Sequence, residues 1–267
     1  MKLKHQPPEP LKQTPHIVAF LDFLGATEKM SDPVKSNKFL QIVNAVYSLA
    51  LSICDKIDEN SNEKPKIKIF SDNIVVAKEI KQPDNPKNIF KTYQDVEQFS
   101  LMIYTAGMTT GNFIRGAISI GELCCNDVFV YGEGLLKAYN GESKNANYPR
   151  IIVDKDIFVK SCVDIWSTFN PPDEENIVLR DMDGELFLNP FYGIPKIAKD
   201  KESDVAKRLG FVSTHIVKEY KDMFAKNKKS VFPKYHWLAN QFNEYCHANN
   251  QPFLINLDKL TLESKND

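Results

Sequence analysis

The chain contains few cysteines, no long apolar run and almost no net charge. Its five cysteines among 267 residues are odd in number and lack Cys-x-x-Cys spacing, which favours reduced thiols in the cytoplasm over disulfides or a zinc site. The 34 lysines and arginines nearly balance the 35 aspartates and glutamates, which argues against a nucleic-acid-binding protein with a broad basic surface. No stretch approaches the roughly 18 apolar residues of a membrane span. We therefore expect a cytoplasmic protein that binds neither nucleic acid nor a membrane.

Several catalytic signatures are missing as well. The chain has no G-x-S-x-G nucleophile elbow and no complete G-x-G-x-x-G loop, and its five histidines include no His-x-x-x-His pair. Residues 1–14 contain basic residues and prolines without the apolar core of a signal peptide, which predicts a flexible lead-in. Serine–histidine hydrolysis and histidine-bound metals are therefore not expected.

The hydrophobic pattern predicts strands that alternate with helices. Apolar runs predict strands at 17–21, 66–70, 74–77, 113–120, 123–130 and 150–153, and helical spacing predicts helices at 33–57, 88–108 and 132–144. This order is typical of an α+β sheet with helices on one face. Two charged amphipathic helices, 202–225 and 231–248, predict a helical extension. The expected organisation is a lead-in (1–14), a catalytic domain (15–199) and that extension (200–267).

Two of the predicted strands deliver an aspartate at or just past their ends. Asp22 follows the apolar run 17–21, and Asp72 lies near the tip of the hairpin formed by 66–70 and 74–77. Either residue alone is well explained as a turn or capping aspartate. Two carboxylates on neighbouring strands, however, are what a pair of hard divalent cations needs to bind a nucleoside triphosphate. The pair therefore predicts a metal-dependent nucleotide enzyme.

The order of these elements is also similar to a known family. With FLDFLG (20–25) on the first strand and FSDN (70–73) on the hairpin, the chain resembles the catalytic domain of class III nucleotidyl cyclases, and IRGAISIGEL (114–123) and VYGEGLLKAYNGES (130–143) look like its later strand pair and helix. AYNGESKNANYPRIIVD (138–154) and KYHWLANQFN (234–243) resemble the bacterial pyrimidine cyclases of Pycsar antiphage defence, which make cyclic UMP or cyclic CMP. The cyclase resemblance covers about residues 15–160.

The resemblance implies a ferredoxin-like palm sheet and two Mn²⁺ or Mg²⁺ ions per site. Asp22 and Asp72 would bridge both ions, and the backbone carbonyl of Phe23 would complete a shell. The turn Phe23-Leu24-Gly25 offers backbone N–H groups to phosphate oxygens. A homodimer is expected, because each site in this fold borrows residues across the subunit interface. UTP is favoured over CTP as substrate, and a separate effector would read the product.

Four further side chains have two readings each. Arg115 lies in a strand between apolar neighbours, where an unpaired charge is costly, so it either reaches phosphate or pairs with an acid. Arg150 has the same two readings. Lys68 occupies the position that contacts the base in the family, or it is a surface lysine with a buried stem. Tyr139 either stacks on a base or is a core aromatic.

The sequence departs from the family in the helix after the second strand pair. An Asn and an Arg that steady the ribose and the transition state are expected there, and Leu136 and Asn140 occupy their places; Glu122 replaces a phosphate-binding Arg. The helix instead has the AY-x-x-E pattern of the pyrimidine cyclases, with Tyr139 and Glu142. One alternative is therefore a catalytically silent homologue that senses nucleotide or binds a partner. Another is a palm-domain polymerase or cyclic-oligonucleotide synthase, which would need a second acid beside Asp72.

Overall fold

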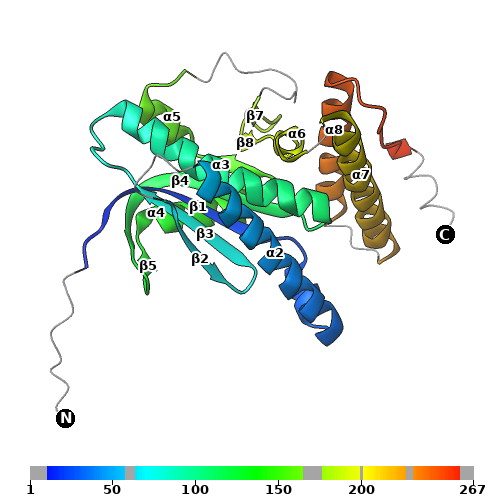
Figure 1. Ribbon diagram of the computed structural model, residues 1–267, viewed down its shortest axis with the longest axis horizontal. Helices are drawn as coiled ribbons and strands as arrows, with labels where there is room; N and C mark the ends of the chain where they lie inside the picture. The colour runs from blue at the N-terminus through cyan, green and yellow to red at the C-terminus, as the bar shows by residue number, and fades with distance from the viewer. Residues whose placement is uncertain (1–10, 58–63, 165–175, 199–200, 227–230, 259–267) are drawn as a thin grey trace, which may run out of the picture.

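The computed structural model describes residues 11–57, 64–164, 176–198, 201–226 and 231–258. Its centre is a mixed sheet in the spatial order β2-β3-β1-β4-β6-β8-β7, and β5 pairs with β4 beside this path (Figure 1). The strands are β1 (Thr14–Phe23), β2 (Lys66–Phe70), β3 (Asn73–Glu79), β4 (Ile114–Cys125), β5 (Val130–Tyr131), β6 (Ile151–Val153), β7 (Val178–Arg180) and β8 (Leu186–Leu188).

The first four long strands form a ferredoxin-like unit. They follow the order β1, helix, β2, β3, helix, β4 along the chain, and they lie antiparallel in the spatial order β2-β3-β1-β4. The connecting helices are α2 (Pro33–Ile57), preceded by the short α1 (Ala26–Met30), and α3 (Pro86–Thr110). The predicted α+β fold of ferredoxin-like topology is confirmed.

Strand β1 is apolar on both faces because it packs on helices on both sides. Ile17 and Leu21 belong to the main core with α3, whereas Val18 and Phe20 face the opposite side and pack with Ala138 of α4 (Glu133–Asn140). Of the three helices expected on one face, α2 and α3 share a face, whereas the helix predicted at 132–144, which is α4, packs on the other face. It is followed directly by η1 (Gly141–Asn145), a single π-helical turn.

Glycines allow α4 to approach the sheet closely. A Cβ atom on Gly121 of β4 would lie 2.8 Å from the backbone of Gly134 in α4, which is too close for a real side chain. The hydroxyl of Ser119 donates a hydrogen bond to the Gly134 carbonyl oxygen at 2.8 Å. Helix α4 and the η1 turn that continues it are therefore fixed on the same face of the sheet as Asp22.

The turn after β4 differs from the sequence prediction. Separate strands were expected at 113–120 and 123–130, but a single strand, β4, runs unbroken from Ile114 to Cys125, and β5 has only two residues. The side chain of Asn126 accepts hydrogen bonds from the backbone N–H groups of Val128 and Phe129, at 2.9 and 2.7 Å. These hydrogen bonds form a local asparagine turn directly after Cys125. Strand β4 therefore ends later than the hydrophobic pattern indicates, and its ladder with β5 is short.

Beyond β6 the sheet is extended by β8 and β7, which the sequence analysis did not predict. Each has three residues, and they are accompanied by the short helices α5 (Lys155–Ser161) and α6 (Gly193–Ile197). Strands this short do not produce a recognisable alternation of apolar and polar residues.

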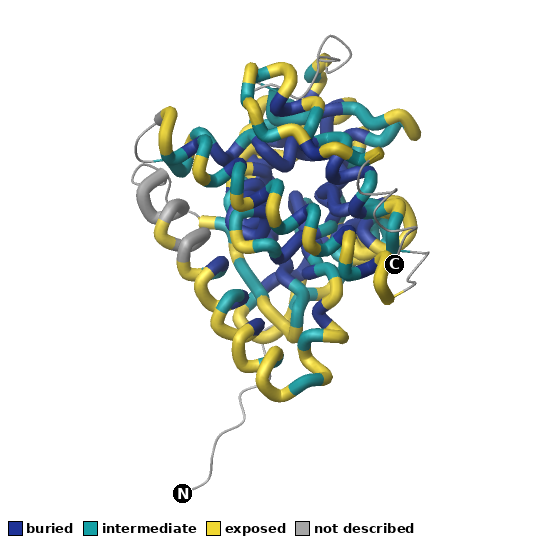
Figure 2. The backbone as a smooth tube through the Cα atoms, turned by 90° about the vertical axis from the view of Figure 1, so that its right-hand side faces the viewer, coloured by how far each residue is buried: buried dark blue, intermediate teal, exposed yellow. Residues whose placement is uncertain are grey.

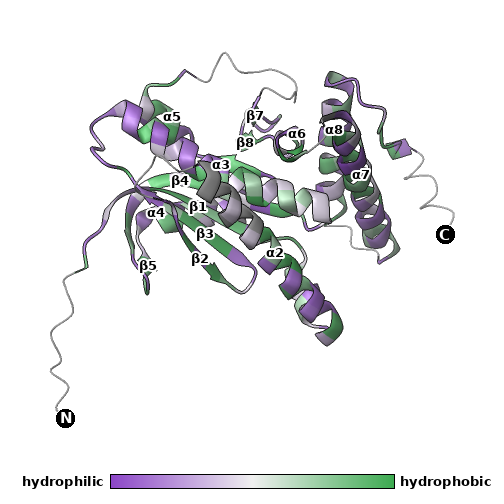
Figure 3. Cartoon of the chain, viewed as in Figure 1, coloured by the Kyte–Doolittle hydropathy of each residue, from purple (hydrophilic) through white to green (hydrophobic). Residues whose placement is uncertain are grey.

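The two C-terminal helices are confirmed. Helix α7 (Lys201–Ala225) and helix α8 (Phe232–Ala248) share one buried cluster with the sheet, including Ile216, Leu238 and Phe242. Helix α7 contains both hydrophilic and hydrophobic residues (Figure 3). The buried segments of the whole chain lie in the interior of the molecule (Figure 2). The helices thus add to the main core; the domain boundary near residue 200 stays a prediction. None of the helices in the described ranges has the length and apolar content needed to cross a bilayer.

Candidate functional site

The strand order brings Asp22 and Asp72 together. Asp22 is the next-to-last residue of β1 and lies opposite Asn73 of β3, directly after the hairpin turn that contains Asp72. The backbone N–H of Phe23 donates to the Asp72 carbonyl oxygen at 3.3 Å. Burial raises the pKa of the Asp22 carboxyl; Arg115 opposes that shift, and the adjacent Asp72 carboxylate adds to it. The two carboxyl groups therefore form one partly buried acidic pair.

Arg115 lies between Asp22 and a third acid. It is opposite Asp22 in the β1–β4 ladder, and its Nε is 3.2 Å from Asp22 Oδ2 and 2.6 Å from Glu142 Oε1. Glu142 lies in the π-helical turn η1 and is almost completely buried. Burial raises the pKa of its carboxyl, and Arg115 opposes that shift. Of the two readings of Arg115, pairing with acids is present, and a phosphate contact stays a prediction.

Lys234 extends this cluster from a distant part of the sequence. It lies in the first turn of α8 and is half-buried, and no described residue is within ion-pair distance of its ammonium group. Burial and the nearby Arg115 lower its pKa, while Glu142 and Asp22 raise it. Lys234 therefore brings an uncommitted positive charge to the acidic pair.

Sequence reasoning gave neither Glu142 nor Lys234 a role in the site. The available signals were the AY-x-x-E pattern for Glu142 and the KYHWLANQFN segment for Lys234. Neither pattern indicates that the side chain reaches the end of β1.

The donor set suits a hard divalent cation. Three carboxylates, from Asp22, Asp72 and Glu142, face two cationic side chains, so the cluster has surplus negative charge. In the described part of the chain, no three acidic, histidine or cysteine side chains could hold a metal ion by themselves. Mg²⁺ and Mn²⁺ in nucleotide enzymes are held by one or two carboxylates together with phosphate oxygens of the substrate. Asp22 and Asp72 fit that arrangement, and the Phe23 carbonyl stays a predicted additional ligand.

Two N–H groups of the predicted phosphate-binding turn have partners within the protein. The N–H of Phe23 is donated to Asp72, and the N–H of Leu24 donates to the Phe113 carbonyl oxygen at 2.9 Å. Both groups are used by the strand ends that hold the two aspartates in place, so they are not available to phosphate. Gly25, which has a left-handed backbone with φ of 71°, stays a prediction.

The two predicted base-binding residues share the face of the sheet that presents Asp22. Lys68 is opposite Val75 in the hairpin, and its ammonium donates to the Asp127 carbonyl oxygen at 2.6 Å in the β4–β5 turn. Tyr139 is 48% exposed and meets the ring of Phe20 edge-on at 5.5 Å, so it is not a core aromatic. Contacts of either residue with a base stay predictions.

Arg150, by contrast, has a structural environment. Its guanidinium forms ion pairs with Asp181 and Asp183, and the side chain is completely buried. The indole N–H of Trp237 donates to the same Asp181 carboxylate at 2.8 Å. The ion pairs of Arg150 thus include neither Asp22 nor Asp72.

No family model matches the sequence, and no curated protein matches it. The fold is similar to solved structures that include the adenylyl cyclase CyaB from P. aeruginosa, with 14% sequence identity and a TM-score of 0.39. That similarity covers 67% of this chain and 93% of the cyclase chain. A likeness at this level carries no argument about activity, so the functional reading depends on the residues and geometry of the site.

Proposed function

We propose that this chain is a metal-dependent nucleotidyl cyclase that converts a pyrimidine nucleoside triphosphate, UTP in preference to CTP, to its 3′,5′-cyclic monophosphate and pyrophosphate. The observation that carries the proposal is the meeting of Asp22 and Asp72 at the ends of neighbouring strands, beside Arg115 and Lys234. The resemblance of the surrounding motifs to pyrimidine cyclases of antiphage defence supports the choice of base. It also supports a signalling role in which a separate effector reads the product.

Each residue of the site has a definite task in this reaction. When bound, the two metal ions lower the pKa of the ribose 3′-hydroxyl and neutralise charge on the triphosphate. Asp22 and Asp72 hold the ions, and their backbone is fixed by the hydrogen bonds of Phe23 and Leu24. Glu142 holds the Arg115 guanidinium beside Asp22, so its direction is set before substrate arrives. Preorganised charges of this kind stabilise the transition state without reorganisation during the reaction.

Lys234 is suited to the phosphates of the substrate. The family's transition-state arginine is missing at Asn140, and Lys234 is the nearby cation with no ion-pair partner among the described residues. An ammonium group that is half-buried beside the acidic pair can bind the oxygens that gain charge as pyrophosphate leaves. We therefore assign to Lys234 the task that the missing arginine has in the family.

The surface around the site suits a second copy of the chain. Phe70 of β2 and Tyr139 of α4 are exposed, and both contact the ring of Phe20, so they form one exposed aromatic patch. Tyr131 of β5 and Leu136 of α4 are also exposed, and exposed apolar side chains of this kind mark interaction sites. A homodimer through this surface would place the partner's residues near the base. Light scattering on the purified protein, with Leu136→Glu as the disrupting variant, tests the expected dimer.

The activity is tested by incubating the protein with each of the four nucleoside triphosphates and Mn²⁺ and detecting products by mass. A cyclic pyrimidine monophosphate, lost in Asp22→Ala and Asp72→Ala and retained in Asp84→Ala, is the expected result. Asp84 is an exposed aspartate in the loop after β3 and is the matched control. A linked oligonucleotide would instead indicate a polymerase-like enzyme.

A catalytically silent nucleotide sensor is the second candidate. The observation that favours it is the exposed Leu136 on α4, where the family's ribose-steadying Asn is expected. Nucleotide binding without any product from the four triphosphates would support the sensor and contradict the cyclase.

A further inference from the structure

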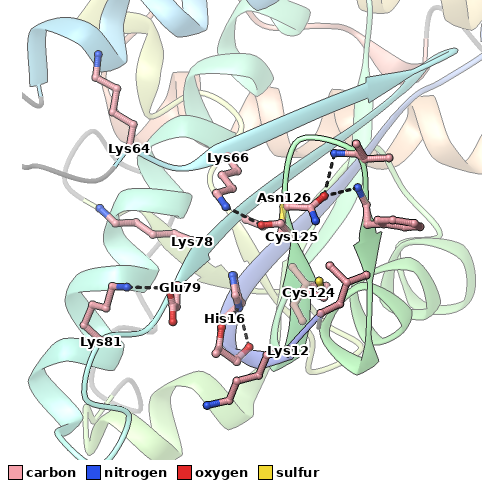
Figure 4. A pocket seen from close by; sticks show the side chains of 16 residues that line it. Lys12, His16, Lys64, Lys66, Lys78, Glu79, Lys81, Cys124, Cys125 and Asn126 are labelled. Carbon is pink, nitrogen blue, oxygen red and sulfur yellow. Dashed lines mark hydrogen bonds and ion pairs between the residues drawn. The ribbon is translucent and has the colours of Figure 1, made fainter. Parts of the chain in front are cut away.

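A large cavity lies at the opposite end of β1 from the acidic pair. It has a volume of about 1130 Å³ and is lined by the start of β1, the ends of β2 and β3, and the β4–β5 turn (Figure 4). His16 lies on its floor, opposite Glu79 of β3. Six residues of extended strand separate His16 from Asp22, or about 20 Å. The cavity is therefore distinct from the candidate active site.

The lining of this cavity is strongly cationic. One carboxylate, that of Glu79, accompanies five lysines, which are Lys12, Lys64, Lys66, Lys78 and Lys81. The whole chain has a net charge of −1, so this concentration of positive charge is local to the cavity. A cavity lined by one sign of charge raises the local concentration of ligands of the opposite sign.

Only part of this charge is neutralised by carboxylates. Lys78 pairs with Asp95 of α3 and Lys81 with Glu79, both at 2.7 Å. The ammonium group of Lys66 instead donates to the Cys125 carbonyl oxygen at 2.6 Å. A carbonyl oxygen does not cancel the charge, and two further N–H bonds of the ammonium group remain for a ligand.

His16 adds a buried polar group to the floor. It is 6% exposed, and its Nδ1 is 2.7 Å from the Thr14 carbonyl oxygen, which fixes the ring. The other ring nitrogen, Nε2, forms no hydrogen bond with any residue in the described ranges, and Figure 4 shows the ring between Lys66 and Glu79. Nε2 of this largely buried side chain is therefore available to a ligand in the cavity.

One wall of the cavity is apolar and preformed. Val128 and Phe129 are 81% and 50% exposed, and both lie in the β4–β5 turn that the Asn126 side chain holds in shape. The N-terminal segment supplies the exposed Leu11. An exposed aromatic ring beside clustered ammonium groups suits a ligand with both an aromatic ring and a phosphate.

We propose that this cavity is a second ligand site that binds a nucleoside phosphate, with its phosphate groups on Lys66 and the neighbouring lysines and its base on Phe129. Several ammonium groups in one cavity favour multiply charged phosphate over a single carboxylate. The ring of Phe129 distinguishes a nucleotide from inorganic phosphate, because a base can stack on it and phosphate alone cannot. This site does not depend on the activity proposed for Asp22 and Asp72.

Calorimetric titration with UTP, ATP and pyrophosphate in EDTA tests the site, because EDTA removes the metal that the acidic pair needs. We expect nucleotide binding to wild type, at least tenfold weaker binding to Lys66→Gln, and recovery in Lys66→Arg. Phe129→Ala should weaken nucleotide binding about tenfold and leave pyrophosphate binding unchanged. Lys66 and Phe129 are both exposed, so their substitution leaves the core intact, which circular dichroism checks.

Two control variants distinguish binding in this cavity from binding at the acidic pair and from general attraction to surface lysines. Asp72→Asn removes part of the acidic pair, and Lys160→Gln removes an exposed lysine of α5 outside the cavity. Both should bind nucleotide in EDTA as wild type does. The proposal is overturned if wild type binds no nucleotide in EDTA, if Lys66→Gln binds as tightly as wild type, or if Asp72→Asn abolishes binding. Equal loss in Lys160→Gln, or binding of an RNA oligonucleotide but of no mononucleotide, would overturn it as well.

Discussion

Two arginines side by side in the sheet have opposite surroundings. Arg115 of β4 and Arg150, directly before β6, lie in the same row, since Gly116 pairs with Ile151, and each forms ion pairs with two carboxylates. Arg150 is completely buried, and Tyr148, stacked on Trp237, lies against its guanidinium. Its charge is paired with Asp181, which is almost completely buried, and with Asp183, whose side chain is 43% exposed.

The ion pairs of Arg115 with Asp22 and Glu142 are partly exposed, and charged groups beside them are not paired. The Arg115 side chain is 25% exposed. The Asp72 carboxylate and Lys234 lie nearby, and Lys234 has no ion-pair partner in the described ranges. Burial and a like-charged neighbour raise the pKa of Asp22. A stable core does not need such an arrangement, whereas a site for a cation and a polyphosphate does. The contrast supports the proposal that Arg115 serves the reaction, whereas Arg150 stabilises the fold.

The largest expected effect distinguishes Asp72, which lies beside Asp22, from Asp183, which pairs with Arg150. Asp72→Asn should lower cyclic nucleotide formation on the order of 10³-fold or more, because metal ions supply several kcal/mol of transition-state stabilisation. Asp183→Asn should leave turnover per folded molecule within about twofold, since the Asp183 carboxylate contacts Arg150 and the backbone N–H of Glu185 and no residue of the acidic pair. Product formation measured by mass, normalised to folded protein, checks both. Equal losses would remove the distinction between the clusters.

Stability should show the reverse order. Arg150→Met should lower the free energy of unfolding by about 3–5 kcal/mol, because it leaves the buried Asp181 carboxylate without its cationic partner. Arg115→Met should cost about 1–2 kcal/mol, since its partner Glu142 has a raised pKa and can take up a proton. Urea unfolding of both variants measures the two losses. An Arg115 variant that is as unstable as the Arg150 variant would make Arg115 structural.

Glu97 provides a third case, a buried acid whose partner is neutral. It accepts a hydrogen bond from the Tyr93 hydroxyl, and burial raises its pKa to about 7. The pKa of Glu97 is higher in the folded state than in the unfolded state, so protonation of Glu97 favours folding. This contribution to the free energy of unfolding is fully present below the unfolded-state pKa, and it is lost as the pH rises through the folded-state pKa of about 7. We expect a loss of about 3 kcal/mol between pH 4.5 and 7.5 in wild type relative to Glu97→Gln. Unfolding free energies at both pH values test this; parallel curves would contradict it.

The smallest expected effect is on Lys234. Lys234→Met should reduce turnover about 10–100-fold through lost phosphate contact, while stability stays within about 1 kcal/mol of wild type. Its ammonium is already disfavoured by burial, so its removal does not expose a partner. Steady-state kinetics together with thermal unfolding separate the two effects. Wild-type turnover in Lys234→Met would show that Lys234 has no part in the reaction.

The sequence predicted the parts of the site that depend on local pattern. Asp22 follows a long apolar strand, and Asp72 occupies a hairpin tip, so period-2 alternation and turn chemistry were sufficient to place both. Glu142 and Lys234 were not predictable in this way. Glu142 reaches the site through a π-helical turn, and Lys234 comes from helix α8, which begins more than 200 residues after the end of β1 and whose position depends on core packing.

The misassigned features have physical reasons too. The N–H groups of Phe23 and Leu24 were expected to bind phosphate, but strand register commits them to Asp72 and Phe113. Register is a tertiary property that local sequence does not specify. The same holds for β7 and β8, whose three-residue runs become strands because β8 pairs with the edge of β6 and β7 pairs in turn with β8.

Mn²⁺ binding in the presence of UTP, followed by electron paramagnetic resonance, tests the central claim most directly. We predict that wild type and the exposed control Asp84→Asn bind Mn²⁺ with equal affinity, and that Asp72→Asn binds at least tenfold more weakly. Asp183→Asn, from the buried arginine cluster, should bind as wild type does. Equal Mn²⁺ affinity in Asp72→Asn and wild type would contradict the assignment of the Asp22–Asp72 pair as the metal site.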